Sequence, residues 1–419
     1  MPVRGLGVDE GTATVKAVQV EKRGAEFVPV AAASIPGRVD GDASGAELAA
    51  AMQAAGIKER AGVVGLTGKD LVIRYHQVPA VPDWQLRQIM EFEVKEIESQ
   101  SGDKLASDFN LLPVASDLSS DDTVLMALSR EDRINERTGN LKSGGIKARY
   151  FVPNSLGLFH AFRLWGPAAS GDVVLVNLGK ACSDLTILRD GELLYARSVN
   201  TGGDVLTEAV RQHFNVSEAK AEKLKCEMGD LRPREQRRGL TPQQEKVSFA
   251  LEGASGRLFQ MVQSTVQFAK TQIQLNQLDP EKIFVTGGSA NMPGLADSLS
   301  ASLGVPVEVF DPVAEAGVEV VGDAGTVDMT VAAGLAALGA DPDAYSVEVL
   351  DAAARKAKEF QDRQLWSVLA VVAILAYLGL FWVRSGDEFV KADKNYTMLK
   401  AEKNGRSSKE SRLKSLSEE

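Results

Sequence analysis

Two stretches of this chain repeat one pattern, and the repeat limits the folds that the sequence can adopt. Residues 6–18 read LGVDEGTATVKAV, and residues 174–187 read VLVNLGKACSDLTI. Aligning Asp9 with Asn177 also aligns Gly11 with Gly179. Each copy is an apolar strand, a polar residue, a glycine and small polar residues that lead into a second alternating strand, and an Asp-Gly turn extends the second copy. The repeat predicts two related α/β lobes that face each other across a cleft.

The composition of these hairpins is typical of a phosphate site. A glycine at the bend lets the backbone approach a phosphate closely, and exposed amides and hydroxyls donate to its oxygens. A carboxylate just before the bend, here Asp9, can hold Mg²⁺ through water. A single hairpin of this kind is usually an ordinary β-turn, but a pair at corresponding places favours phosphate binding. Neither a dinucleotide-binding GxGxxG motif nor a P-loop is present in the sequence.

Three further motifs follow the second hairpin. Residues 200–214 read NTGGDVLTEAVRQHF, with Gly202 and Gly203 as a turn before a helix. Glu222 and Lys225 are three residues apart on the next helix, where a solvated ion pair is the alternative to a binding role. Gly287, Gly288 and Ser289 open the helix of a βαβ unit, where ligands usually lie at the helix N-terminus.

Charge and residue usage exclude several classes of function. The net charge is −10, the pI is near 5.1 and the basic residues are scattered, which argues against a nucleic-acid partner. The 419-residue chain contains two cysteines and three histidines without a clustered motif, so neither a Cys/His metal site nor a disulfide framework is expected.

One segment is unlike the rest of the chain. Residues 365–383 read LWSVLAVVAILAYLGLFWV, without a charged residue. As a helix this segment would be about 28 Å long, close to the hydrocarbon thickness of a bilayer. Trp366 and Trp382 suit the two membrane interfaces, whereas a buried core helix is the alternative. Because no apolar signal stretch opens the sequence, we expect one transmembrane helix with the large N-terminal part in the cytoplasm.

The domain organisation that follows has six parts. We expect the first part of one lobe at 1–60, an inserted α+β subdomain at 61–150 and the remaining core at 151–345. A linker at 346–364, the transmembrane helix at 365–383 and a periplasmic stalk at 384–419 complete the chain.

The order of these motifs resembles the PilM family, actin-like proteins of type IV pilus assembly related to FtsA. The resemblance runs from about residue 5 to 340 and includes both hairpins, GGDVLTEAV, AEKLK, VTGGSANMPGL and AAGLAAL. It implies an α/β, two-lobed actin-like fold, as in actin and Hsp70 ATPases, with residues 61–150 as an interaction subdomain. It also implies ATP with Mg²⁺ in the interlobe cleft, with Asp9 as the metal-site residue.

The resemblance assigns roles to individual residues. Gly11, Thr12, Thr14 and Lys16 would line the first phosphate hairpin, and Asn177, Gly179 and Lys180 would line the second. Gly202 and Gly203 would approach the nucleotide, Glu222 and Lys225 the ribose, and Gly287, Gly288 and Ser289 the adenosine.

The chain also departs from the family pattern. Asn177 stands where the family has Asp, and Asn154 stands near a place where an acidic residue is expected. An Asn side chain brings no charge for Mg²⁺ or for activating water, so we expect ATP binding rather than efficient hydrolysis and assign no catalytic residue. The membrane segment is the second departure, because PilM is typically soluble and docks on PilN. Residues 365–419 look like the start of a PilN, and the layout resembles GspL of type II secretion.

These features predict a cytoplasmic, nucleotide-binding scaffold in the inner-membrane platform of a type IV pilus or type II secretion-like machine. The expected partners are PilN-like and PilO-like inner-membrane proteins, the lipid bilayer and the assembly motor ATPase, and a homo-oligomer is left open. Two alternatives remain: an FtsA-like cell-division protein and a small-molecule kinase of the actin superfold.

Overall fold

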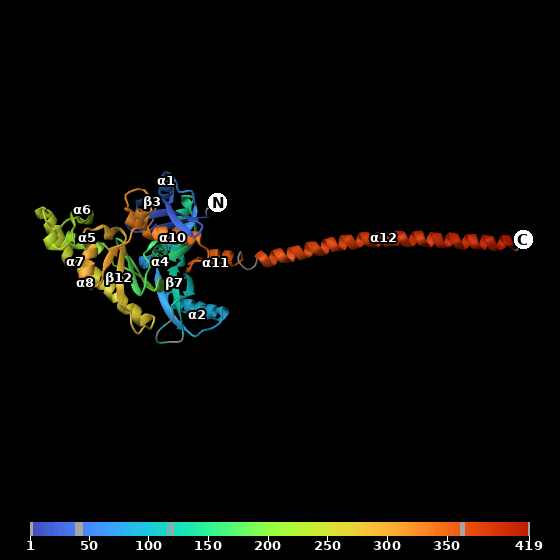
Figure 1. Cartoon of the computed structure of the whole chain (residues 1–419), viewed down its shortest axis with the longest axis horizontal. Helices are drawn as coiled ribbons and strands as arrows, with labels where there is room; N and C mark the ends of the chain where they lie inside the picture. The colour runs from blue at the N-terminus through green and yellow to red at the C-terminus, as the bar shows by residue number, and fades with distance from the viewer. Residues whose placement is uncertain are drawn as a thin grey trace. The chain divides into compact units, whose positions relative to one another are not determined.

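The computed structural model describes residues 3–37, 45–114, 116, 118, 121–360 and 365–417, with the side chains of 359, 365 and 415 left out. Two compact units make up the chain, Met1–Ala352 and Ala353–Glu419. The first unit contains the sheets and most helices, and the second contains the long helix α12 (Figure 1).

A six-stranded sheet forms the first lobe, in the order β14-β3-β2-β1-β4-β8. Its strands β1, β2 and β3 form an antiparallel meander, and β4 and β8 add to it in parallel. Residues 5–10 of β1 are buried, and residues 5–8 among them are glycine or aliphatic, as a strand covered on both faces requires. The strands are β1 (Val3–Glu10), β2 (Thr14–Arg23), β3 (Glu26–Pro36), β4 (Ala61–Leu66), β8 (Lys147–Pro153) and β14 (Val320–Val321).

A five-stranded sheet forms the second lobe, in the order β11-β10-β9-β12-β13. It repeats the arrangement of the first: an antiparallel meander of three strands, then parallel strands beside the first of them. The two related lobes that the repeat predicts are therefore present. The strands are β9 (Asp172–Leu178), β10 (Ser183–Arg189), β11 (Glu192–Val199), β12 (Pro280–Thr286) and β13 (Val307–Val309).

Two buried helices, α4 (Asn154–Trp165) and α10 (Thr330–Ala340), pack between these sheets (Figure 1). Their backbones approach closely because glycines stand at the contacts. A Cβ atom on Gly334 of α10 would lie 1.8 Å from the carbonyl oxygen of Gly157 in α4. A Cβ atom on Gly7 of β1 would lie 2.0 Å from the carbonyl oxygen of Ala332. The small residues of AAGLAAL therefore permit helix and sheet to pack at backbone distance.

The remaining helices of the two lobes lie mainly around the second sheet. The helices α5, α6 and α7 contact one another, and a capping box formed by Thr241 and Gln244 begins the long helix α7. These helices are α1 (Gly45–Ala54), α5 (Asp204–Phe214), α6 (Glu218–Met228), α7 (Pro242–Gln272), α8 (Leu295–Leu303) and α9 (Pro312–Glu315).

The inserted subdomain contains a separate three-stranded sheet, in the order β5-β7-β6. Its elements are β5 (Val72–Val78), α2 (Asp83–Ser101), β6 (Leu105–Leu111), β7 (Asp122–Arg130) and α3 (Glu131–Ser143). The expected bounds of 61–150 are wider than this sheet, because β4 pairs with β1 and β8 in the large sheet. The sequence alone could not separate β4 from β5, since only a short 3₁₀ turn, η1 (Gly68–Asp70), divides them.

The first residues of the expected linker at 346–364 belong to the first unit. Val347 and Val349 are fully buried, and Val349 pairs with Phe151 through backbone hydrogen bonds. In the second unit, α11 (Ala352–Glu359) precedes α12 (Leu365–Ser417), a single helix that covers both the expected transmembrane segment and most of the stalk. Among the described residues, one helix is long and apolar enough to cross a membrane, and it is this one.

Candidate nucleotide-binding cleft

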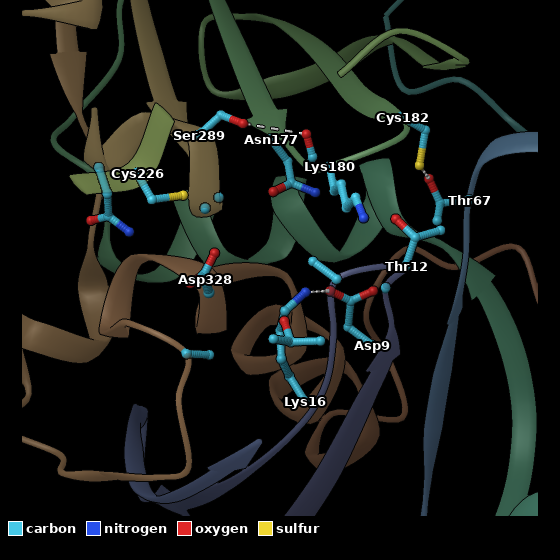
Figure 2. Close-up of a pocket in the computed structure, with 18 of the residues that line it drawn as sticks. Asp9, Thr12, Lys16, Thr67, Asn177, Lys180, Cys182, Cys226, Ser289 and Asp328 are labelled. Carbon is cyan, nitrogen blue, oxygen red and sulfur yellow. Dashed lines mark hydrogen bonds and ion pairs between the residues drawn. The ribbon is translucent and has the colours of Figure 1, made fainter. Parts of the chain in front are cut away.

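The two glycine hairpins meet at one cavity of about 340 Å³. Figure 2 shows Asp9, Thr12 and Lys16 of the first hairpin on one side, with Asn177 and Lys180 of the second across from them. This volume lies in the range of small-molecule sites. Of the residues proposed from the sequence, the following line the cavity: Asp9, Gly11, Thr12, Thr14, Lys16, Asn177, Gly179, Lys180, Glu222, Lys225, Gly287, Gly288 and Ser289.

Gly202 and Gly203 are the two proposed residues that do not line the cavity. They pack behind the second hairpin, where the backbone N–H of Gly203 donates to the carbonyl of Gly179 at 2.9 Å. A Cβ atom on Gly203 would lie 2.5 Å from Oγ of Ser289. Their place in the structure is therefore to support Gly179 and Ser289 from behind.

The glycines of the cavity have the geometry that close approach to a phosphate requires. A Cβ atom on Gly11 would lie 2.8 Å from the carbonyl oxygen of Thr14 and 3.0 Å from Nζ of Lys16. A Cβ atom on Gly179 would lie 2.7 Å from the carbonyl oxygen of Cys182. Gly287 has a φ of +87°, which an L side chain rarely adopts. The residue types at these bends therefore follow from the backbone.

A buried ion pair closes the first hairpin. Nζ of Lys16 lies 2.7 Å from Oδ2 of Asp9 (Figure 2). Nδ2 of Asn154 donates to Oδ1 of Asp9 at 2.9 Å. Burial opposes the charge on Lys16, but the attraction of Asp9 and of Asp328 outweighs it, and the pKa of Lys16 is raised. Lys16 is therefore a fixed cation at the cavity wall.

A carboxylate that we did not assign from the sequence, Asp184, lies at the second hairpin. Its Oδ2 accepts a hydrogen bond from Nδ2 of Asn177 at 3.1 Å, and its Oδ1 accepts one from Oγ1 of Thr67 at 2.6 Å. Asp184 lines the cavity although only 1% of it is exposed. Burial raises its pKa to about 6, against the hydrogen bonds that favour its charged form.

Asp328 is a second missed carboxylate of the cavity. It lies in the turn η4 (Thr326–Met329) that begins α10, and it accepts a hydrogen bond from the backbone N–H of Gly325. Burial raises its pKa, while Lys16 opposes that shift. Asp184 and Asp328 therefore line the cavity in addition to Asp9 and Glu222, the two carboxylates assigned from the sequence.

Glu222 and Lys225 form an ion pair in which Lys225 is buried and the side chain of Glu222 is 33% exposed. Nζ of Lys225 lies 2.7 Å from Oε2 of Glu222, and Thr207 hydrogen-bonds to both side chains. Lys225 is only 6% exposed. Burial disfavours the charge of Glu222, but Lys225 and Thr207 outweigh this effect, and the pKa of Glu222 is lowered. The pair is therefore only partly solvated, since its lysine is buried and its carboxylate is half-buried.

The residues of the cavity fit Mg²⁺ only in part. Within the parts of the chain that the structure describes, no three His, Cys, Asp or Glu side chains are grouped so as to hold a metal ion. Asp9 offers one carboxylate, which already contacts Lys16 and Asn154. Such a site fits an Mg²⁺ ion that keeps several water ligands and takes most of its other ligands from bound phosphates.

Comparisons with known proteins agree with this geometry. A model of the family described as "Type IV pilus assembly protein PilM" matches residues 7–340. A solved structure named "PilM-PilN type IV pilus biogenesis complex" superposes with a TM-score of 0.64 at 23% identity, and the match covers 81% of this chain and 99% of that one.

Among curated proteins, cell division protein FtsA of Enterococcus hirae is 25% identical over 182 residues. That match covers 41% of this chain and 40% of FtsA, so it spans less than half of either protein. The two-lobed actin-like α/β fold expected from the sequence is confirmed. Because the family model covers well over half of the chain, the protein belongs to the type IV pilus assembly protein PilM family.

Proposed function

We propose that this protein is an ATP-binding scaffold of the inner-membrane platform of a type IV pilus machine. One observation carries the proposal: two glycine hairpins from separate lobes converge, with Lys16 and Lys180, on a single cavity. Two cations and several glycine bends facing one space are suited to a chain of phosphates. The sugar and base would then extend toward α6 and the Gly287 turn.

The individual contacts follow from the chemistry of the wall. The backbone amides near Gly11 and Gly179 and the hydroxyls of Thr12 and Thr14 would donate to phosphate oxygens. The Glu222–Lys225 pair would meet the ribose hydroxyls, since a carboxylate accepts from a hydroxyl and an ammonium donates to it. Mg²⁺, when bound with the phosphates, would neutralise their charge beside Asp9.

The membrane part of the proposal rests on α12. Its first 19 residues are uncharged, and apolar side chains are exposed on all sides of this part, which water does not favour. We propose that this segment spans the inner membrane, with the nucleotide-binding unit in the cytoplasm. The solved structure that superposes with a TM-score of 0.64 is named as a PilM-PilN complex, and we propose a PilN-like partner for this chain too.

The composition of α12 also argues against the two alternatives, an FtsA-like division protein and a small-molecule kinase. An amphipathic helix on the membrane surface, as in FtsA-like anchoring, needs a polar face, and residues 365–383 do not have one. A small-molecule kinase would gain no evident benefit from a membrane-spanning helix. We therefore favour the scaffold.

Arginines in the middle of the span are expected to release the protein from the membrane. Each charge at the centre of a transmembrane helix costs about 2.5–3.5 kcal/mol on insertion scales. We expect Leu375→Arg/Leu378→Arg to move the chain from the alkali-washed membrane fraction to the soluble fraction, and to abolish pilus formation when it replaces the native copy in the cell that encodes it. Immunoblotting of the fractions measures release from the membrane, and electron microscopy measures pilus formation.

The matched control places the same charges beyond the expected span. Leu399→Arg/Leu413→Arg alters exposed leucines of the same helix and should leave the chain in the membrane. Retention of the Leu375/Leu378 variant in washed membranes would contradict the proposed span. Normal pili in cells whose variant is fully soluble would contradict the need for anchoring.

A further inference from the structure

The repeat of the two hairpins extends to a pair of facing residues. In the first hairpin Asp9 pairs with Lys16 across β1 and β2, and in the second Asn177 pairs with Asp184 across β9 and β10. The alignment that places Asp9 on Asn177 also places Lys16 on Asp184. In the first pair the carboxylate is on the first strand. In the second pair it is on the second strand, so the acidic group is exchanged across the ladder rather than lost.

The surroundings of Asp184 fix this exchanged arrangement. Thr67, which follows β4 in the first lobe, donates to Oδ1, Asn177 donates to Oδ2, and Ser198 adds a third side-chain hydrogen bond. Because Nδ2 of Asn177 points to Asp184, Oδ1 of Asn177 points to the bend at Gly287. A Cβ atom on Gly287 would lie 2.4 Å from this Oδ1. The pair therefore presents a carboxylate and an oriented amide oxygen at the floor of the cavity.

We infer that Asp184 is the catalytic carboxylate of ATP hydrolysis in this cleft and supplies the negative charge that Asn177 lacks. This inference rests on the proposed function, since it requires ATP in the cavity. Asp184 lines that cavity, and its two oxygens, which together offer about four acceptor sites, keep one for a further donor beside the hydrogen bonds from Thr67, Asn177 and Ser198. A water molecule held there would face the phosphates that the two hairpins bind.

The reaction is balanced without any further reactant. The oxygen of the water forms a bond to the terminal phosphorus of ATP, and the bond between that phosphorus and the bridging oxygen of ADP breaks. Asp184 accepts a proton from the water and later passes it to the released phosphate, so that ATP and water give ADP and phosphate. A base whose pKa is about 6 is deprotonated at neutral pH and close to the optimum for proton transfer.

The exchanged pair also predicts how substitutions at its two positions combine. Asn177→Asp alone would place two carboxylates at the 3.1 Å separation that now joins an amide to a carboxylate. Like charges that close cannot both ionise easily, so this variant would not simply gain activity. Asn177→Asp combined with Asp184→Asn keeps one carboxylate and one amide in contact and only exchanges their strands.

The test compares the full chain in detergent with Asp184→Asn and with the exchange variant. Calorimetric titration measures ATP binding, and a single-turnover assay measures phosphate release. We expect Asp184→Asn to bind ATP within about threefold of wild type but to release phosphate at least about 100-fold more slowly, the usual loss when a general base is removed. The exchange variant should recover to within about tenfold of wild type.

A pH series without ATP supplies a readout that does not depend on turnover. Folding raises the pKa of Asp184 above its usual value, so the folded chain holds this proton more tightly than the unfolded chain. The melting temperature of wild type minus that of Asp184→Asn should therefore fall as the pH rises from about 4 to about 6 and stay level above. Asp9 and Cys182 are the other titratable groups that act on Asp184 or lie beside it, and both variants retain them.

The outcomes separate this inference from the proposed function. Binding without measurable phosphate release by wild type would overturn the role of Asp184 while leaving ATP binding intact. Wild-type release by Asp184→Asn, or an exchange variant no faster than Asp184→Asn, would also overturn it. If Asp184→Asn does not fold, the exchange variant decides alone. Absence of ATP binding by wild type would refute the proposed function itself.

Discussion

Replacing Gly334 with alanine is expected to cost about 4 kcal/mol or more of unfolding free energy, although the added group is one methyl. The new Cβ atom would lie 1.8 Å from the carbonyl oxygen of Gly157, and the clash is between two helix backbones. No side-chain rotation can relieve it, so α10 and α4 must move apart. Both helices pack between the two sheets, and their separation would loosen the core that positions the hairpins.

The measurement is urea unfolding of residues 1–352, the compact unit, followed by circular dichroism. Gly253→Ala is the matched control, because Gly253 lies in the exposed face of α7 with no atom within 4 Å of the added Cβ. That substitution should stabilise the protein by about 0.5–1 kcal/mol, since glycine is a poor helix former. Equal effects of the two substitutions would contradict the close packing of α4 and α10.

Arg137→Ala is expected to cost about 3–5 kcal/mol, as removal of one partner of a buried ion pair usually does. The guanidinium of Arg137 in α3 contacts Glu10 at 3.0 Å and Asp70 at 2.8 Å, and the Glu10 side chain is 2% exposed. Burial opposes the charge of Arg137, but the two carboxylates outweigh this effect and raise its pKa. Without it, a buried carboxylate remains beside Asp9, so α3 would no longer hold the first hairpin.

The control lies one turn away on the same helix. Arg133 pairs with Glu136 on the exposed surface, and Arg133→Ala should change the unfolding free energy by about 1 kcal/mol or less. Urea unfolding of residues 1–352 at pH 7 distinguishes the two. A loss below about 1 kcal/mol for Arg137→Ala would show that water reaches Glu10 and Asp70, against the burial described above.

The sequence predicted the fold and most of the cavity wall because these depend on local patterns. Strand alternation, glycine bends and the repeat fixed the two lobes, and 13 of the 15 proposed residues line the cavity. Gly202 and Gly203 were expected to approach the nucleotide but lie behind the second hairpin, because the place of their turn depends on tertiary packing. The pairing of Glu222 with the buried Lys225 likewise involves Thr207, which lies on another helix and hydrogen-bonds to both side chains.

Asp184 was missed for a reason that the strand register makes clear. The family pattern places an acidic residue at position 177, where this chain has Asn177. The acidic residue is Asp184, which faces Asn177 on the neighbouring strand, and only the pairing of β9 with β10 brings these two residues together. The repeat offset contains this signal, because it aligns Lys16 with Asp184, but strand pairing is needed to interpret it. Asp328 reaches the cavity through the turn before α10, a contact between distant parts of the chain.

The central claim, that the cleft binds ATP, is tested most directly by calorimetric titration of Mg-ATP into the full chain in detergent. We predict saturable binding of one ATP per chain, weakened at least about tenfold by Lys16→Ala, which removes a charge-assisted contact to phosphate. The control Lys142→Ala, an exposed lysine of α3 outside the cavity, should leave the affinity unchanged. No binding at millimolar ATP, or binding that Lys16→Ala does not weaken, would contradict the account.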